Sequence, residues 1–142
     1  MPIDVTQVLA PGQNSLVRKV IQRSDTAANY CEALSEFLAT PSWVDMAIRA
    51  STEAVDKHLP EGFMTVGSSI QVNHGAPTCL GMTVTVNSTL KEINGSHLLF
   101  EIKAWDELGE IGIGTHERIV VNREAMLKKA KERWKLMVKR SF

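Results

Sequence analysis

The chain has 142 residues, of which 44% are hydrophobic and 23% charged, and its 16 basic and 16 acidic side chains give a formal net charge of zero. This length and composition suit one folded domain and exclude a disordered chain. A zero net charge gives no general attraction to nucleic acid or to an anionic membrane, so neither is an expected partner. No apolar run approaches the roughly 20 residues that cross a bilayer, and Cys31 and Cys79 form no CxxC pair. We therefore expect a single cytoplasmic domain over residues 1–142 with reduced thiols.

The N-terminal part is predicted to hold an irregular lead-in and one strand. Residues 1–13 contain Pro2, Pro11 and Gly12, which disfavour regular structure. Residues 15–22 are rich in branched apolar side chains and predict a strand. Residues 24–39 fit no clear period, and a short helix that begins at Ser24-Asp25 is one interpretation.

A long helix is predicted to begin at Thr40-Pro41. The Thr40 hydroxyl can cap the free N–H groups of the first turn, and Pro41 suits the first helical position. Leu59-Pro60-Glu61-Gly62 ends the helix. The apolar positions at helical spacing are Val44, Ala47, Ile48, Ser51 and Ala54.

Four strands are predicted next, over residues 65–73, 83–93, 97–106 and 110–122. Asn94-Gly95 between the second and third of these predicts a type I′ hairpin turn. The expected apolar faces are Val84, Val86, Ser88 and Leu90; then Leu98, Phe100, Ile102 and Ala104; and in the last strand Ile111, Ile113, Ile119 and Val121.

Residues 123–142 predict an amphipathic helix, with an apolar stripe opposite a face rich in lysine and arginine. That basic face is more simply a solvated surface than an anchor for phosphate groups or for an acidic surface. The stripe consists of Leu127, Ala130, Trp134, Met137 and Val138. The order strand, helix, four strands, helix predicts an α+β fold in which an antiparallel sheet covers one long helix.

Residues 39–41, 72–76, 77–86 and 112–118 together resemble the hot-dog acyl-CoA thioesterases related to fluoroacetyl-CoA thioesterase. The likeness runs from about residue 14 to residue 122, and Gly-Thr-His-Glu-Arg at 114–118 is its most specific part. The resemblance implies a hot-dog fold, with the antiparallel sheet wrapped around the long helix. It also implies a homodimer with the active site at the subunit interface. The substrate would be an acyl-CoA, with no cofactor beyond the CoA that the substrate carries and no metal.

The resemblance also implies site residues. A catalytic threonine falls on Thr40 and a catalytic histidine on His74. A glycine that binds the substrate or oxyanion through its N–H falls on Gly67, and an arginine falls on Arg118. One hypothesis is that His74 activates water, Thr40 orients that water and Gly67 donates to the oxyanion.

Two positions depart from the family. Ile48 stands where the family has a catalytic glutamate, and it cannot act as a base or nucleophile. Asp45, one helical turn earlier, is the candidate replacement carboxylate, although a solvated carboxylate is the simpler interpretation. Leu34 stands where fluoroacetyl-CoA thioesterase has a phenylalanine in its lid. We therefore do not expect the fluoroacetyl substrate for this chain.

The spacing alone also permits plainer roles. Thr40 would then be only a helix cap, and His74 a turn histidine bonded to the backbone. His116 and Arg118 share a strand face that is either exposed or an interface, and Cys79 is a small core or loop residue rather than a nucleophile. Three functions remain open: acyl-CoA hydrolysis, a degenerate acyl-CoA-binding or purely dimeric protein that lost catalysis with Ile48, and, ranked last, hydration of an enoyl-CoA. A tetramer is left open beside the dimer.

Overall fold

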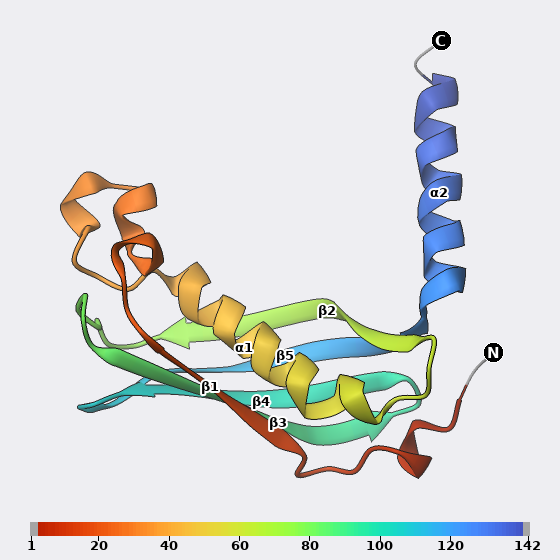
Figure 1. Ribbon diagram of the computed structural model, residues 1–142, viewed down its shortest axis with the longest axis horizontal. Helices are drawn as coiled ribbons and strands as arrows, with labels where there is room; N and C mark the ends of the chain where they lie inside the picture. Colours follow the sequence, from red (N-terminus) through yellow and green to blue (C-terminus); the bar gives the residue numbers. More distant parts are fainter. Residues whose placement is uncertain (1–2, 141–142) are drawn as a thin grey trace.

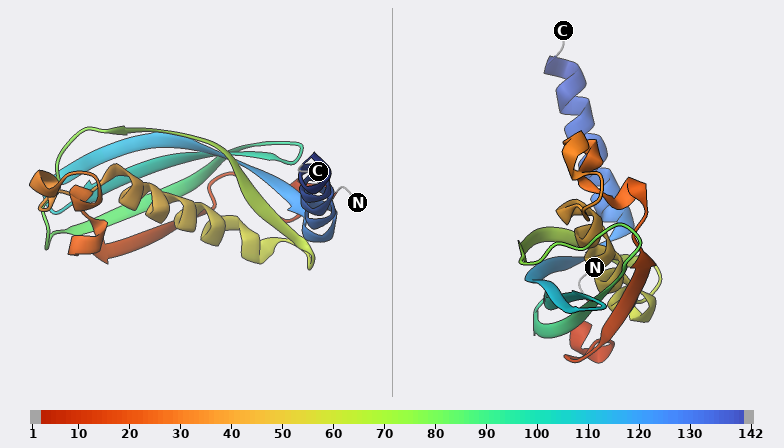
Figure 2. Two further views of the ribbon diagram at one scale, coloured as in Figure 1. Left: turned by 90° about the horizontal axis from the view of Figure 1, so that it is seen from above. Right: turned by 90° about the vertical axis from the view of Figure 1, so that its left-hand side faces the viewer.

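The computed structural model describes residues 3–140. One long helix, α1 (Thr40–Val55), lies along the concave side of a five-stranded antiparallel sheet (Figures 1 and 2). The strands are β1 (Asn14–Val20), β2 (Phe63–His74), β3 (Thr83–Asn94), β4 (His97–Asp106) and β5 (Gly109–Asn122). Their order across the sheet is β1-β3-β4-β5-β2, so β1 and β2 form its two edges. The predicted α+β fold is confirmed, as is the predicted order of elements.

The segment between β1 and α1 holds three short 3₁₀ turns rather than the single helix considered for residues 24–39. The turns span Arg23–Asp25, Ala27–Asn29 and Glu32–Leu34. They stack beyond the N-terminal end of α1 (Figure 1). Each contains a side chain or backbone group that closes its own turn, which short polar sequences achieve more easily than a continued helix.

Helix α1 buries a face that is displaced from the predicted one. Val44 is half-buried and Ile48 is 38% exposed, whereas Trp43 is fully buried. The small side chains of Ala47, Ala50 and Ala54 are buried, as expected for a helix that the sheet approaches closely. The buried positions are Trp43, Met46, Ala47, Ala50, Ser51, Ala54 and Val55.

The core consists of two apolar clusters with polar side chains between them. One cluster surrounds Trp43 near the start of α1, and the other surrounds Val55 near its end. Ser51 lies between the two along the helix and is fully buried, as is Ser88 of β3. A buried polar group costs stability unless it is hydrogen-bonded, so this middle layer must be internally paired.

The strands β3 and β4 bury the faces predicted from their alternation, but β5 does not. Ile113 is 45% exposed, and the inward positions of β5 include His116, Arg118 and Val120. The register between β4 and β5 shifts between Ala104 and Trp105, which leaves Ile111 unpaired in the ladder and indicates a bulge at Ile111 in β5. An extra residue in one strand reverses the alternation beyond it, so the predicted apolar face of β5 was wrong except at Ile111.

The β3–β4 turn also differs from the prediction. Asn94 pairs with His97 as the last ladder pair, so Gly95 and Ser96 form the two-residue loop. Gly95 has a φ of 63°, and no non-glycine residue in the described chain has a positive φ. A positive φ at the first central position alone is the pattern of a type II′ turn, so the type I′ prediction was wrong.

Helix α2 (Arg123–Arg140) stands away from the sheet, beginning at the end of β5 (Figure 1). None of its described side chains is buried. The predicted helix is therefore present, but its apolar stripe is not buried within residues 3–140. No helix in the described part of the chain is long and apolar enough to cross a membrane.

Candidate functional site

Thr40 and His74 lie in direct contact at the N-terminal end of α1. Thr40 Oγ1 is 2.7 Å from Nδ1 of His74, the last residue of β2. Ala39 is the N-cap residue, and no side chain caps this helix, so Thr40 does not have the capping role that its position suggested. The hydroxyl is committed to the histidine, and the interpretation of Thr40 as a plain helix cap was wrong.

The His74 ring is fixed by what surrounds it. Trp43 meets it edge-on, with the ring centroids 5.8 Å apart. His74 Nε2 is buried and has no hydrogen-bond partner in residues 3–140, as is also true of Trp43 Nε1. Burial lowers the pKa of His74, and the nearby backbone of Ala76 partly offsets this effect. Nδ1 is therefore the ring nitrogen with a defined partner, the Thr40 hydroxyl.

The residues beside this pair leave room for a small group. A hollow of about 240 Å³ is lined by His74 and its neighbours. Phe37 contributes a large apolar side chain to the hollow and is 39% exposed. The full lining is Phe37, Leu38, His74, Gly75, Ala76 and Pro77.

A second polar cluster forms around Gly67 in the first half of β2. A Cβ atom on Gly67 would lie 3.5 Å from Arg118 Nη1 and 3.6 Å from His116 Nε2. A side chain at this position would fill a small space, which we call the Gly67 opening. Arg118 and His116 are only 6% and 2% exposed, so the interpretation of their face as exposed was wrong, whereas an interface there stays a prediction.

Arg118 is held from behind by a relay of hydrogen bonds. Its Nε donates to Thr65 Oγ1 and its Nη2 to the Thr65 carbonyl oxygen, both at 2.8 Å. Thr65 Oγ1 in turn donates to Asp56 Oδ1 at 2.6 Å, just beyond the end of α1. Burial lowers the pKa of Arg118, and the Asp56 carboxylate opposes that shift. Nη1 is thereby left facing the Gly67 opening.

His116 is held by two buried serines. Ser51 Oγ lies 2.9 Å from His116 Nδ1 and 2.6 Å from Ser88 Oγ. Burial, and secondarily the charge of Arg118, lowers the pKa of His116 to about 4, so the imidazole is neutral near pH 7. No local sequence signal pairs a serine of a helix with a histidine of a distant strand, so this contact was not predicted.

The two clusters are far apart within one chain. Gly67 and His74 are seven residues apart on β2, and seven strand residues span about 23 Å. The bulge between Gly67 and Ser69 places Thr65 and Gly67 on the same inward side as Ile70, Val72 and His74. The structure therefore brings Thr40 to His74 and Gly67 to Arg118, but it does not bring the two pairs together.

The remaining predicted positions lie outside both clusters. Asp45 is exposed and forms an i,i+4 ion pair with Arg49 at 2.8 Å, which supports the solvated-carboxylate interpretation. Ile48 is on the same helix, one turn before Ser51, and partly exposed. Leu34 lies in the 3₁₀ turns before α1 and is 40% exposed. Cys79 is an exposed free thiol.

The glycines of β5 admit close neighbours, as their positions suggested. A Cβ on Gly112 would lie 2.7 Å from a ring carbon of Trp43, so the tryptophan packs directly on the strand. A Cβ on Gly114 would collide with the backbone of β2. Gly112 thus helps to place Trp43, and through it the His74 ring.

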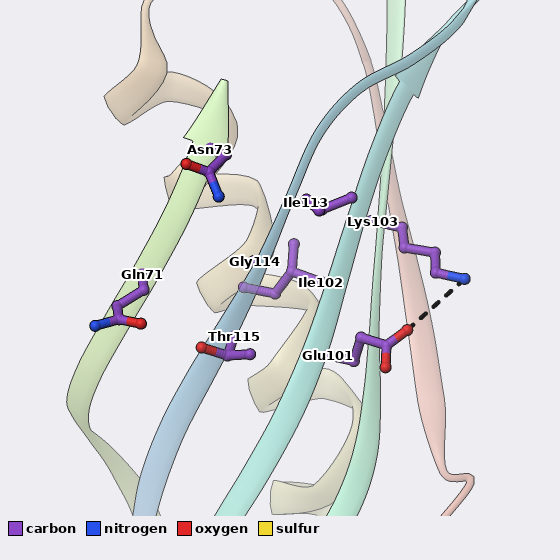
Figure 3. A pocket seen from close by; sticks show the side chains of 8 residues that line it. All are labelled: Gln71, Asn73, Glu101, Ile102, Lys103, Ile113, Gly114 and Thr115. Carbon is purple, nitrogen blue, oxygen red and sulfur yellow. Dashed lines mark ion pairs between the residues drawn. The ribbon is translucent and has the colours of Figure 1, made fainter. Parts of the chain in front are cut away.

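A larger hollow lies on the other face of the sheet and shares no residue with either cluster. Figure 3 looks onto the sheet with α1 behind the strands, and shows Gln71, Glu101 and Lys103 around the hollow. Glu101 Oε1 and Lys103 Nζ form an ion pair at 3.7 Å beside the hollow. The hollow has a volume of about 370 Å³. No group of metal-ligating side chains occurs in residues 3–140.

Known proteins match this chain in sequence and in fold. The family model described as fluoroacetyl-CoA-specific thioesterase matches residues 21–124. Fluoroacetyl-CoA thioesterase of Streptantibioticus cattleyicolor is 36% identical over 98 residues, which cover 69% of this chain and 70% of that protein.

The solved structures agree. A hot-dog-like protein from Thermanaerovibrio acidaminovorans superposes with a TM-score of 0.88 at 32% identity, covering 92% of this chain and 97% of that one. A variant of the fluoroacetyl-CoA enzyme FlK, solved in complex with acetyl-CoA, superposes with a TM-score of 0.80 at 28% identity, covering 88% of this chain and 98% of that one. The predicted hot-dog fold is confirmed by these neighbours.

Proposed function

Since the chain belongs to the family of fluoroacetyl-CoA-specific thioesterases, we propose that it hydrolyses an acyl-CoA thioester to the free acid and CoA. The observation that carries the proposal is the 2.7 Å contact between Thr40 Oγ1 and His74 Nδ1. A hydroxyl and a neutral imidazole in hydrogen-bond contact form a proton-accepting pair near neutral pH. The pair also lies at the positive end of α1, which favours negative charge on a nearby oxygen.

In the proposed reaction, water attacks the thioester carbonyl carbon. The water gives a proton to Thr40 Oγ1 while the Thr40 hydroxyl proton moves to His74 Nδ1. The tetrahedral intermediate then expels the CoA thiolate, which takes the proton back from His74 and leaves as the thiol. The lowered pKa of His74 keeps its imidazole unprotonated, and therefore able to accept this proton, at pH 7.

We further propose that the site is shared by two copies of the chain. Thr40 and His74 need a donor for the oxyanion, and the Gly67 cluster on the same chain is about 23 Å away along β2. Strand β2 is an edge of the sheet, with one side unpaired among the described strands, and such an edge favours pairing with another strand. Antiparallel pairing of two β2 strands with residue 67 opposite residue 74 would bring the partner's Gly67 beside His74. Both residues face inward, so they would then lie on the same side of a continuous sheet.

A second function is favoured by one specific observation. Ile48 replaces the family glutamate and is partly exposed on α1, between Thr40 and Ser51. Without that carboxylate the protein would bind an acyl-CoA and turn it over slowly or not at all. Asp45 is a poor substitute because its carboxylate is exposed and paired with Arg49.

The acyl group differs, under this proposal, from the fluoroacetyl group of the named relative. Leu34, expected to occupy the position of a lid phenylalanine, lies in a turn that precedes α1 and is partly exposed. Phe37, three residues later, lines the hollow beside His74 instead. A different apolar side chain over the same hollow would change which acyl groups fit.

The test is release of free CoA thiol from acetyl-, phenylacetyl-, benzoyl- and long-chain acyl-CoA, with the His74→Ala protein alongside. Turnover on one substrate that falls more than tenfold in the variant, with the fold unchanged, supports the thioesterase. Turnover that the variant retains removes His74 from the reaction. No turnover on any substrate, together with measurable CoA binding, supports the degenerate binding protein.

A further inference from the structure

We propose that His116 is a further hydrogen-bonding group of the acyl-CoA site. Its Nε2–H, beside the Arg118 guanidinium, would donate to the thioester carbonyl oxygen, and Ser51 and Ser88 would fix the tautomer that carries this hydrogen. The inference rests on the proposed function and on the site shared between two copies.

The first step is the convergence of two nitrogen atoms on one small space. Arg118 Nη1 and His116 Nε2 lie 3.5 Å and 3.6 Å from the place where a Cβ of Gly67 would be. Gly67 itself is exposed, whereas both side chains are buried. A glycine at this position leaves room for one small group from outside, and the two nitrogens are the polar atoms that the group would meet.

The second step is the tautomer of His116. Two hydrogen bonds join Ser88 Oγ, Ser51 Oγ and His116 Nδ1 in a chain. If Nδ1 accepts from Ser51, then Ser51 accepts from Ser88, and both buried hydroxyl hydrogens are used. If Nδ1 instead carries the hydrogen, the Ser88 hydroxyl hydrogen has no recorded partner in residues 3–140, which costs free energy in a buried site. The first arrangement is therefore favoured, and it places the ring hydrogen on Nε2.

The third step is the chemistry that this nitrogen offers. A neutral imidazole with hydrogen on Nε2 is a fixed donor, and Arg118 Nη1 is a second, charged donor beside it. Two donors aimed at one point fit an oxygen that gains negative charge during the reaction. Because Ser51, Ser88, Thr65 and Asp56 hold both side chains from behind, neither donor needs to reorganise when that charge appears.

Three variants test the role of the ring nitrogen by steady-state hydrolysis of the best acyl-CoA in the thiol-release assay. His116→Leu keeps an apolar side chain against Phe100 but removes the donor, and kcat should fall about 10²-fold with a much smaller change in KM. His116→Gln places an amide N–H near the position of Nε2 and should recover a large part of kcat. Ser51→Ala should give a loss between these two, because both tautomers then become accessible.

The Gly67→Ala variant tests the opening without disturbing the fold. The added methyl group would make only ordinary van der Waals contacts, and the glycine has no positive φ, so the variant should unfold at the wild-type temperature. It should nevertheless lose activity because the methyl group fills the opening. Ser68→Ala is the matched control, since Ser68 is exposed and donates only to the Glu117 carbonyl oxygen.

A binding measurement keeps the two proposals separable. The probes are an acetyl-CoA analogue with a methylene in place of the thioester sulfur, and S-ethyl-CoA, which lacks the carbonyl. Wild type should prefer the ketone analogue, and His116→Leu should reduce that preference about tenfold. If wild type hydrolyses acyl-CoA and His116→Leu keeps both kcat and the preference, the role of His116 is refuted while the thioesterase stands. If wild type hydrolyses nothing but the preference falls as expected, the carbonyl contact stands and hydrolysis does not.

Discussion

The contact between Thr40 and His74 gives the sharpest prediction about the role of a single hydroxyl. Thr40→Val keeps the shape of the side chain and removes Oγ1, so the 2.7 Å contact with His74 Nδ1 is lost. Since the hydroxyl does not cap α1, the expected stability cost is that of one partly buried hydrogen bond, about 1 kcal/mol. The rate of thioester hydrolysis should fall about 10²–10⁴-fold, the range for losing a group that positions or transfers a proton.

The assay is a double-mutant cycle on kcat with Thr40→Val, His74→Ala and the double variant, and with Thr40→Ser as the control that retains a hydroxyl. If the two residues act as one unit, Thr40→Val should change kcat little once His74 is gone. Unfolding by urea, measured in parallel, separates a loss of rate from a loss of fold. Effects on kcat that multiply independently, or a Thr40→Val enzyme with wild-type rate, would refute the reasoning.

Three further predictions concern the core and the departure at position 48. The pKa of His116 is lowered to about 4 in the folded protein, so as the pH falls the histidine is protonated in the unfolded chain before it is protonated in the folded one. The free energy of unfolding should therefore fall by up to about 3 kcal/mol between pH 6.5 and pH 4. In His116→Leu this part of the slope should be missing from urea titrations at each pH, and a persisting slope would assign it to other groups. Gly112→Ala should lower the free energy of unfolding by about 1–3 kcal/mol, because its methyl group would press into Trp43 and into the backbone oxygen of Asn73; wild-type stability would show that both neighbours give way freely. Ile48→Glu should raise kcat, since residue 48 is partly exposed and can accept a carboxylate; no gain at unchanged stability would mean that other parts of the site have also diverged.

The elements of this fold were predictable because each has a strong local signal. Thr40-Pro41 marks the start of α1, and the period-two alternation of β3 and β4 gave the correct buried faces. These signals depend on residues close together in the chain. The family resemblance then supplied what local patterns do not, namely that Thr40 and His74 belong together.

The errors arose where a contact between distant residues decides the outcome. The bulge at Ile111 reversed the faces of β5, and no feature of residues 110–122 alone marks its position. His116 and Arg118 are buried because Ser51 and Thr65 bind them from other elements. The hydrogen bond that removes Thr40 from a capping role comes from β2, 34 residues later. A sequence pattern reports on local geometry, whereas these pairings depend on how distant elements pack in the folded chain.

The most direct test of the shared site is activity in mixed dimers. His74→Ala and Gly67→Ala proteins are each expected to hydrolyse acyl-CoA poorly, because each lacks one half of both sites. The two variants are mixed, denatured and refolded together, and about half of the resulting dimers should carry one subunit of each kind. In each of these mixed dimers, one of the two sites has an unaltered His74 facing the partner's unaltered Gly67. We predict that thiol release recovers to roughly a quarter of the wild-type rate, on the general expectation that homo-oligomers pair through symmetric interfaces. A mixture no more active than the average of the two separate variants would contradict the shared site.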